Sequence, residues 1–255
     1  MSKQSRIRTQ ELRKAQQEAA ARKAKQRRIA QALGGVVILG LVAAIVWAVV
    51  NAASGDDDGG GPTGTVVVPD NVTSSGAFPV GADDAPVTVE IYYDYMCPAC
   101  GAFESVNEAE LDRLMSEGVA KVELRPISIL DRFSEGTEYS TRSASAFATV
   151  VDGAPDSAWA FHSALFEQQP DEGTEGLSDD EIADIATDAG VPADVVDQFG
   201  EGTFEAWVAS VTDEATTDGG VQGTPTVKID GEVFEGDWSR PGVLTEAIES
   251  AAGDQ

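Results

Sequence analysis

Two cysteines, Cys97 and Cys100, are the only ones in the 255-residue chain, and they lie within the stretch "YYDYMCPACGAF". Two thiols at this spacing can form a structural disulfide, supply half of a metal site, or exchange disulfides with other proteins. A structural disulfide would close a loop of about four residues and add only about 2 kcal/mol in the chain-entropy model. A zinc site needs four ligands, and beyond the cysteines the chain holds one distant histidine, His162. The redox alternative needs only the residues present, so we favour it and expect no metal and no cofactor.

The segments around the cysteines predict how they are positioned. The sequence "APVTVEIYYDY", residues 85–95, is rich in Val, Ile and Tyr and predicts a strand. Pro98 suits the first position of a helix, which we expect to end near Gly118. Cys97 would then lie at a helix N-terminus, where free N–H groups and the helix dipole stabilise a thiolate. We therefore predict that Cys97 attacks and Cys100, one turn deeper, resolves the mixed disulfide. The expected pKa of Cys97 is between about 4.5 and 6.5.

The remaining elements predict an α/β fold interrupted by helices. Residues 119–130 read as a second strand, which makes a parallel strand–helix–strand unit. Residues 131–220 have helical spacing, and Ser178 with Glu181 forms a capping box there. The sequence "TPTVKIDGEVFEG", residues 224–236, predicts two strands around an Asp-Gly turn, and a last helix follows.

Pro225 lies directly before the first strand of that hairpin. A proline in this place is usually an edge-strand or turn device. The functional alternative is a cis-proline loop that faces Cys97 and presents backbone to an extended peptide. The CxxC upstream favours the functional alternative. By contrast, His162, between Trp159 and Phe166, is predicted to be a packed or surface imidazole rather than a catalytic one.

Two stretches, "VGADDAPVTVEIYYDYMCPACGAFE" and "GVQGTPTVKIDGEVFEG", resemble motifs of the membrane-anchored DsbA-like thiol-disulfide oxidoreductases in the thioredoxin-like superfamily. The resemblance covers about residues 75–252. It implies a thioredoxin-like fold with an inserted helical subdomain at 131–220. It also implies Cys97 as the nucleophile, Cys100 as the resolving cysteine, and Thr224-Pro225 as the cis-proline pair that binds substrate. Pro98, Ala99 and Asp94 are the supporting residues.

The chain departs from the family pattern at two positions. Many DsbA proteins have His where this chain has Ala99, and many have an acid six residues before the first cysteine, where this chain has Ile91. Glu90 is one residue away and would point to the opposite face of the strand. Asp94 shares the face of Glu90 and could take over proton transfer, or be a solvated or capping acid. With Ala99 in the motif we expect a disulfide that is a moderate oxidant.

The charge is distributed unevenly along the chain, which has a net charge of −27. Ten of the 17 Lys and Arg residues, but two of the 44 acids, lie in residues 1–33. No charged residue occurs between Arg28 and Asp56, and a helix of about 19 residues there would span about 28 Å, close to the thickness of a bilayer. We predict a transmembrane helix at 32–51, a basic cytoplasmic arm at 1–31 and a flexible linker at 52–74. A cleaved signal peptide is the alternative.

These patterns predict a single-pass membrane protein whose catalytic domain lies outside the cytoplasm. The expected activity is dithiol–disulfide exchange on exported cysteine-containing proteins, with oxidation as the direction. A membrane redox partner would recycle the cysteine pair, and the N-terminal helix would hold the protein in the lipid bilayer. The acidic surface repels nucleic acid, so no such partner is expected. The alternatives are a reductase, for instance for haem-attachment cysteines, and a non-catalytic peptide-binding module.

Overall fold

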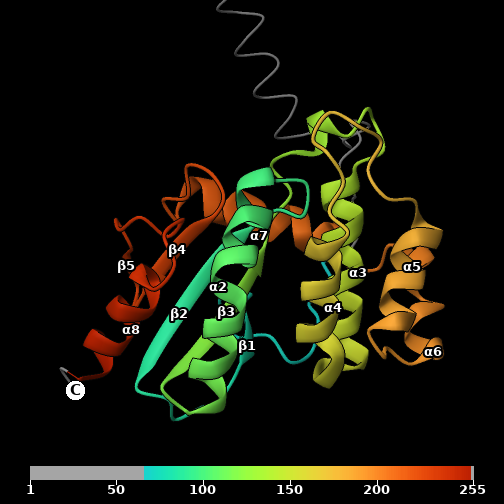
Figure 1. Cartoon of the computed structure of the whole chain (residues 1–255). Coiled ribbons are helices and arrows are strands. Elements are labelled where there is room, and N and C mark those ends of the chain that lie inside the picture. Colours follow the sequence, from blue (N-terminus) through green and yellow to red (C-terminus); the bar gives the residue numbers. More distant parts are fainter. Residues whose placement is uncertain (1–65, 254–255) are drawn as a thin grey trace, which may run out of the picture. The chain divides into compact units, whose positions relative to one another are not determined.

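The computed structural model describes residues 66–253 (Figure 1). The predicted arm at 1–31 and the predicted membrane helix at 32–51 lie outside the described residues. Within residues 66–253, no helix combines the length and the apolar character that crossing a membrane requires.

A five-stranded mixed sheet forms the centre of the domain, in the order β1-β3-β2-β4-β5. Strand β2 pairs in parallel with β3 and antiparallel with β4, and β5 completes the C-terminal hairpin. The short edge strand β1 pairs antiparallel with β3 and was not predicted, because three residues carry too little alternation to be recognised. The strand bounds are Phe78–Val80 (β1), Val87–Tyr93 (β2), Ala120–Pro126 (β3), Thr226–Ile229 (β4) and Glu232–Val233 (β5).

The predicted strand–helix–strand unit and the hairpin are both confirmed. Helix α2, Pro98–Ser116, connects β2 to the parallel strand β3. Asp230 and Gly231 form the hairpin turn with φ values of 50° and 84°, which the primed turns of tight hairpins require.

Alternating side chains of β2 face two different layers. Ile91 and Tyr93 are buried in the main core, where α2 and the last helix α8, Val243–Gly253, also bury their apolar side chains. Tyr92 lies on the other face, in a smaller cluster with Ala215 of helix α7. Helix α7, Glu205–Thr217, therefore covers the opposite face of the sheet, behind it in Figure 1.

Residues 131–220 form the predicted helices, but they do not all belong to one subdomain. The N-terminal half of α7 packs on α3 through Phe204 and Trp207, while its C-terminal half contacts the sheet. The separate helical subdomain is therefore smaller than the sequence predicted. It consists of the 3₁₀ turn η1 (Asp131–Phe133), α3 (Tyr139–Gly153), α4 (Pro155–Glu167), α5 (Asp179–Asp188), α6 (Ala193–Val196) and the 3₁₀ turn η2 (Phe199–Glu201). The predicted capping box at the start of α5 is present.

The end of the predicted linker needs a correction. Residues 66–74 are described, and part of this segment is fixed to α3 by hydrogen bonds. The Asn71 amide donates to the Val151 carbonyl at 3.0 Å, and the Asp70 N–H donates to the Asp152 carboxylate at 2.7 Å. The folded domain therefore begins before residue 75.

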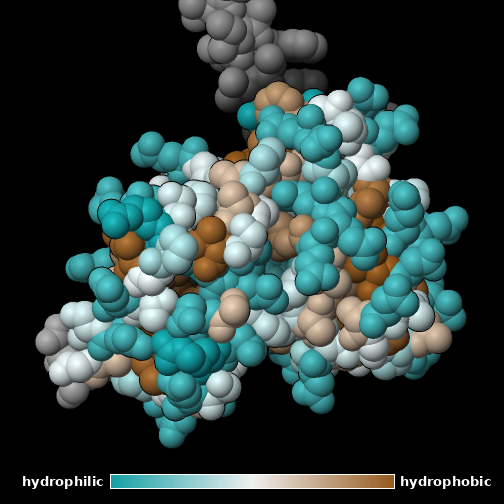
Figure 2. Space-filling model, viewed as in Figure 1, coloured by the Kyte–Doolittle hydropathy of each residue, from teal (hydrophilic) through white to brown (hydrophobic). Residues whose placement is uncertain are grey.

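The surface of the domain reflects the surplus of acidic residues in the sequence. In the view of Figure 2, hydrophilic residues cover most of this face, and apolar residues show only in smaller groups between them. Polar residues of this kind are extensively solvated.

Candidate active site

The junction of β2 and α2 places the two cysteines as predicted. Cys97 is the N-cap residue of α2, and Pro98 occupies the first turn. The Cys97 carbonyl accepts hydrogen bonds from the N–H groups of Cys100 and Gly101, at 3.0 and 3.2 Å. Cys97 keeps 7% of its surface exposed and Cys100 only 1%, and both are free thiols. Cys97 is therefore the more accessible of the two thiols.

The loop before β4 brings Thr224 and Pro225 to the same place. Strand β4 pairs with β2, with Thr226 opposite Tyr92, so residues that are 127 positions apart in sequence become neighbours. The Thr224-Pro225 peptide bond is cis, as the resemblance implied. In its protonated form the Cys97 thiol donates to the Thr224 carbonyl, with Sγ and O 3.3 Å apart. The structure thus assembles all four predicted residues, and their roles in catalysis and substrate binding stay predictions.

The two thiols differ strongly in acidity. A hydrogen bond from the Cys100 thiol is the main cause that lowers the pKa of Cys97 to about 6, and the N–H groups of Cys100 and Ala99 act in the same direction. Burial opposes this shift, but more weakly. Burial also raises the pKa of Cys100 well above its usual value, and the neighbouring Cys97 sulfur adds to the increase. At neutral pH the shared proton therefore stays on Cys100, and Cys97 carries the negative charge.

The value for Cys97 lies inside the predicted range, but its cause is only partly the one predicted. The sequence pointed to the helix N-terminus, and the N–H groups there do contribute. The larger contribution comes from the second thiol of the pair. Stabilisation by Cys100 exists only in the reduced protein, so the pair itself favours its reduced form.

Asp94 is a buried structural anchor of the loop that leads to Cys97. It is 1% exposed, so the solvated interpretation is wrong. Its carboxylate accepts from the N–H of Met96 at 2.9 Å, the N–H of Leu130 at 3.0 Å and the hydroxyl of Ser140 at 2.7 Å. Burial raises the pKa of Asp94 to about 7, although these hydrogen bonds oppose the shift. Asp94 therefore connects the redox loop to the start of α3.

Ile91, where many DsbA proteins have an acid, and the neighbouring acid Glu90 lie on opposite faces of β2. Ile91 is fully buried in the core, so no acid lies at that position. Glu90 forms an ion pair with Arg125 at 2.9 Å, and Arg125 also lies over the ring of Tyr92. Glu90 therefore faces away from the cysteines, as expected from the alternation of the strand.

A buried polar network beneath Cys100 was not predicted. His162 is completely buried, which confirms the packed imidazole, but its ring joins two ionisable partners. Its Nε2 lies 3.3 Å from Glu104 Oε1, and its Nδ1 lies 3.1 Å from the Tyr95 hydroxyl. The Tyr95 hydroxyl is in turn 3.4 Å from that of Tyr93. Glu104 follows Cys100 by four residues on the same face of α2, and this acid within an apolar stripe is the signal that could have revealed the network.

Gln169 is the second residue that the sequence analysis missed. Its side-chain amide donates to the carbonyl of Tyr95 at 3.0 Å and to that of Cys97 at 2.8 Å. The residue lies just after α4, so the helical subdomain contacts the backbone of the predicted nucleophile directly. The available signal was Gly101, a glycine inside a predicted helix.

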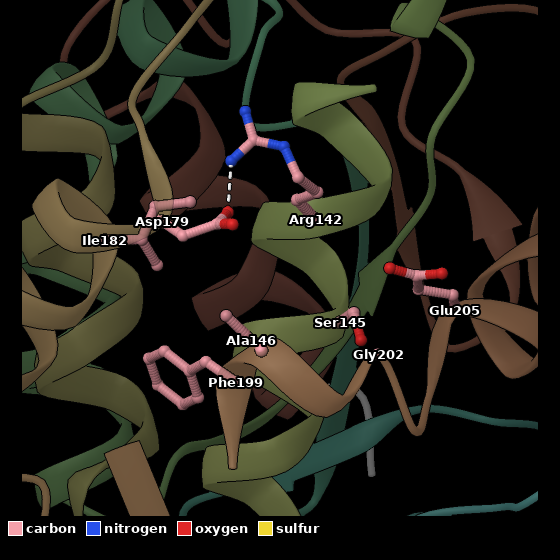
Figure 3. A pocket seen from close by; sticks show the side chains of 9 residues that line it. Arg142, Ser145, Ala146, Asp179, Ile182, Phe199, Gly202 and Glu205 are labelled. Atoms are coloured by element: carbon pink, nitrogen blue, oxygen red, sulfur yellow. Dashed lines mark hydrogen bonds and ion pairs between the residues drawn. The ribbon is translucent and has the colours of Figure 1, made fainter. Parts of the chain in front are cut away.

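Within residues 66–253, no group of three or more His, Cys, Asp or Glu side chains is arranged to hold a metal ion. Figure 3 shows a pocket between α3, α5 and the start of α7, where Arg142 pairs with Asp179 at 2.6 Å. Arg142 also donates to the carbonyls of Thr137 and Leu177, so its charge serves the packing of the helices.

Comparisons with known proteins agree with this geometry. Residues 73–249 match the family described as Thioredoxin. Disulfide bond formation protein D of Bacillus subtilis (strain 168) is 30% identical over 158 residues, which are 61% of this chain and 68% of that protein. The reduced form of the disulfide bond oxidoreductase DsbG from Mycobacterium tuberculosis is 28% identical with a TM-score of 0.61, over 70% of this chain and 88% of the other. MdbA, a thiol-disulfide oxidoreductase from Actinomyces oris, is 26% identical with a TM-score of 0.62, over 76% and 94% of the two chains.

Proposed function

The chain belongs to the thioredoxin family and is a thiol-disulfide oxidoreductase of the DsbA/DsbG type, and from this premise we propose that it oxidises cysteine pairs of exported proteins outside the cytoplasm. The observation that carries the direction is the unequal acidity of the two thiols. A thiolate that is stabilised at Cys97 favours the reduced enzyme, and a disulfide whose reduced form is stabilised is an oxidant.

The reaction follows from this arrangement in two exchanges. A substrate thiolate attacks Cys97 Sγ, the Cys97–Cys100 bond breaks, and Cys100 leaves and takes a proton because its pKa is raised. The second substrate thiolate then attacks the substrate sulfur bound to Cys97. Cys97 leaves as a thiolate, which its lowered pKa favours. The substrate loses two electrons and gains a disulfide, while the enzyme gains the two electrons.

The reduction potential of the Cys97–Cys100 pair tests the direction. We expect a value between that of a strong oxidant, about −120 mV, and that of a reductant, about −270 mV, and nearer the former. Ala99 replaces the histidine of the most oxidising members, which is why the expected value is not at the extreme. A potential at or below about −270 mV would contradict the proposal and favour the reductase alternative.

Trapping experiments test the roles of the two cysteines. Cys100→Ala should accumulate mixed disulfides with exported proteins, because the Cys97 thiolate can still attack a disulfide of the substrate but no Cys100 thiolate is present to displace the substrate from Cys97. Cys97→Ala should trap almost none, since Cys100 is 1% exposed. Equal trapping by the two variants would overturn the assignment of Cys97 as the outer cysteine that exchanges with the substrate.

The proposed location rests on the sequence of residues 1–51. Ten basic residues precede an uncharged apolar stretch, which supports a cytoplasmic N-terminus, a single membrane span and an external catalytic domain. In this arrangement a membrane redox partner reoxidises the cysteine pair. In intact cells, residues 60–255 should be exposed to added protease and residues 1–28 should be shielded from it. Recovery of a soluble form that begins near Ala52 would instead support a cleaved signal peptide.

A further inference from the structure

Gly101 is an unusual residue for its position in helix α2. It is the fourth residue of the helix, where alanine would form a more stable helix. No positive φ requires glycine here, so the reason must be steric. A Cβ atom at residue 101 would lie 2.2 Å from Oε1 and 3.1 Å from Cδ of Gln169. Glycine is therefore the residue that lets the Gln169 side chain approach the helix.

Gln169 uses this approach to bind the backbone before and at the nucleophile. Its Nε2 donates to the carbonyls of Tyr95 at 3.0 Å and Cys97 at 2.8 Å. The residue is half-buried, and its own N–H is fixed by the Phe166 carbonyl at the end of α4. Helix α4 in turn packs against α2. Gln169 thus follows directly on the C-terminal end of α4, and the hydrogen bond to the Phe166 carbonyl fixes its backbone there.

The redox loop is consequently tied to the helical subdomain on two sides. Asp94, a residue of the loop, accepts hydrogen bonds from Leu130 and Ser140. Gln169, a residue of the helical subdomain, donates hydrogen bonds to the loop carbonyls of Tyr95 and Cys97. When the disulfide is closed, the bond between Cys97 and Cys100 also restrains the loop. When the disulfide opens, that covalent restraint is lost, and the loop depends on its hydrogen bonds alone. The Gln169 contacts therefore matter more for the reduced than for the oxidised protein.

We propose that Gln169 is a positioning residue of the redox pair, with Gly101 as its steric counterpart. Its amide holds the Cys97 carbonyl so that, after reduction, the Cys97 sulfur stays at the N-terminus of α2 and opposite Thr224. By stabilising the reduced form selectively, Gln169 makes the disulfide a stronger oxidant. A biological role for this stabilisation of the reduced form rests on the proposed oxidising function. The stabilisation itself does not depend on that function.

The chemistry of the side chain allows a direct test. Glutamate has almost the same shape as Gln169 but, when ionised, donates no hydrogen bond and places negative charge against two carbonyl oxygens. Methionine fills similar space without donating. We expect Gln169→Glu and Gln169→Met to lower the equilibrium constant for reduction by glutathione at least threefold in the full chain. By the two-electron constant this is about 14 mV towards a weaker oxidant.

The neighbouring exposed residue provides the matched control. Gln168→Met should leave the glutathione equilibrium at the wild-type value, because the Gln168 side chain is exposed. Thermal unfolding of both redox forms separates positioning from packing. If the Gln169 variants lose equal stability in the two forms and keep the wild-type potential, Gln169 only fills space and the proposal is overturned.

A double-mutant cycle tests the contact with Gly101. Gly101→Ala should weaken the oxidant in the wild-type background, because the added Cβ displaces the Gln169 amide. In a Gln169→Ala background the same substitution should leave the glutathione equilibrium unchanged, because the higher helix propensity of alanine stabilises both redox forms. An equal effect of Gly101→Ala in both backgrounds would contradict the coupling. The wild-type potential separately tests the oxidising function, because a shift relative to wild type is measurable whatever that potential is.

Discussion

The two sides of Cys97 are built in opposite ways. On one side the loop from Asp94 to Met96 is at most 1% exposed and is fixed to the helical subdomain by Asp94, Gln169 and the Tyr95–His162 contact. On the other side residues 222–226, including the cis-proline pair, are half-buried or exposed. In this segment the Thr226 hydroxyl donates a hydrogen bond to the Gly223 carbonyl, only three residues away in sequence. The proposed nucleophile, Cys97, is therefore held by many contacts on one side, while the other side, where we propose that substrates bind, is more open.

On the buried side of Cys97, we expect the largest loss of stability from replacing His162. In His162→Leu the buried Glu104 carboxyl and the Tyr95 hydroxyl both lose their imidazole partner, and leaving a buried polar group without a partner costs about 1–3 kcal/mol for each group. Urea unfolding of the reduced protein at neutral pH measures the loss. Ser163→Ala is a matched control on the same helix, because among the described residues nothing pairs with the buried Ser163 hydroxyl. A loss below about 1 kcal/mol in His162→Leu would show that the network contributes little.

Asp94→Ala should have the next largest effect. The substitution leaves two backbone N–H groups and the Ser140 hydroxyl without their acceptor, which costs about 2–4 kcal/mol. Because burial raises the pKa of Asp94 from 3.8 to about 7, its contribution to stability falls as the pH rises from about 4 through 7. The wild type and the variant should therefore differ more at pH 5 than at pH 8. A gap that widens towards pH 8 would show that the anion, not the neutral acid, stabilises the fold.

The accessible side is tested by the reactivity of Cys97 itself. With a pKa of about 6, the rate of alkylation should rise about tenfold between pH 5 and pH 7. The same lowered pKa stabilises the reduced form fully above about pH 9, and this stabilisation is lost as the pH falls through 6. Cys100→Ala removes the thiol that donates to Cys97, so the midpoint of alkylation should move to higher pH. An unchanged midpoint would mean that the helix N-terminus alone sets the acidity.

The smallest effect is expected on the open side of the site. Thr226→Val removes one half-buried hydrogen bond and should cost about 0.5–1 kcal/mol. The alkylation midpoint of Cys97 should stay at the wild-type value, because Thr226 does not contribute to that pKa shift. If Thr226→Val lost as much stability as Asp94→Ala, the two sides of Cys97 would not differ in how strongly they are held.

Local patterns were enough to predict the elements that carry the cysteines. The strand and helix on either side of Cys97, the proline at the first helical position and the Asp230-Gly231 turn each depend on nearby residues. Such signals can be recognised in the sequence because they arise from side-chain periodicity and backbone sterics. The burial order of the two cysteines followed directly from their places in the first turn.

The contacts that fix the redox loop could not be predicted in the same way. Gln169 lies 72 residues from Cys97, and His162 lies 58 residues from Glu104, so their meeting depends on how α4 packs against α2. No local periodicity encodes that packing. The traces left in the sequence were a glycine inside a helix and an acid on its buried face, and each has several explanations until the opposite helix is placed.

The meeting of Cys97 with Thr224, 127 residues later, has a consequence for the order of events during biosynthesis. A chain made from its N-terminus completes both cysteines and strand β2 long before β4 exists. At about 5–20 residues per second, several seconds pass in which both thiols lack the hairpin that will flank them. Strand β2 also has an unpaired edge during that interval. The nascent protein is thus itself a cysteine-containing chain in need of correct folding, and it gains its complete active site only with the last fifth of its sequence.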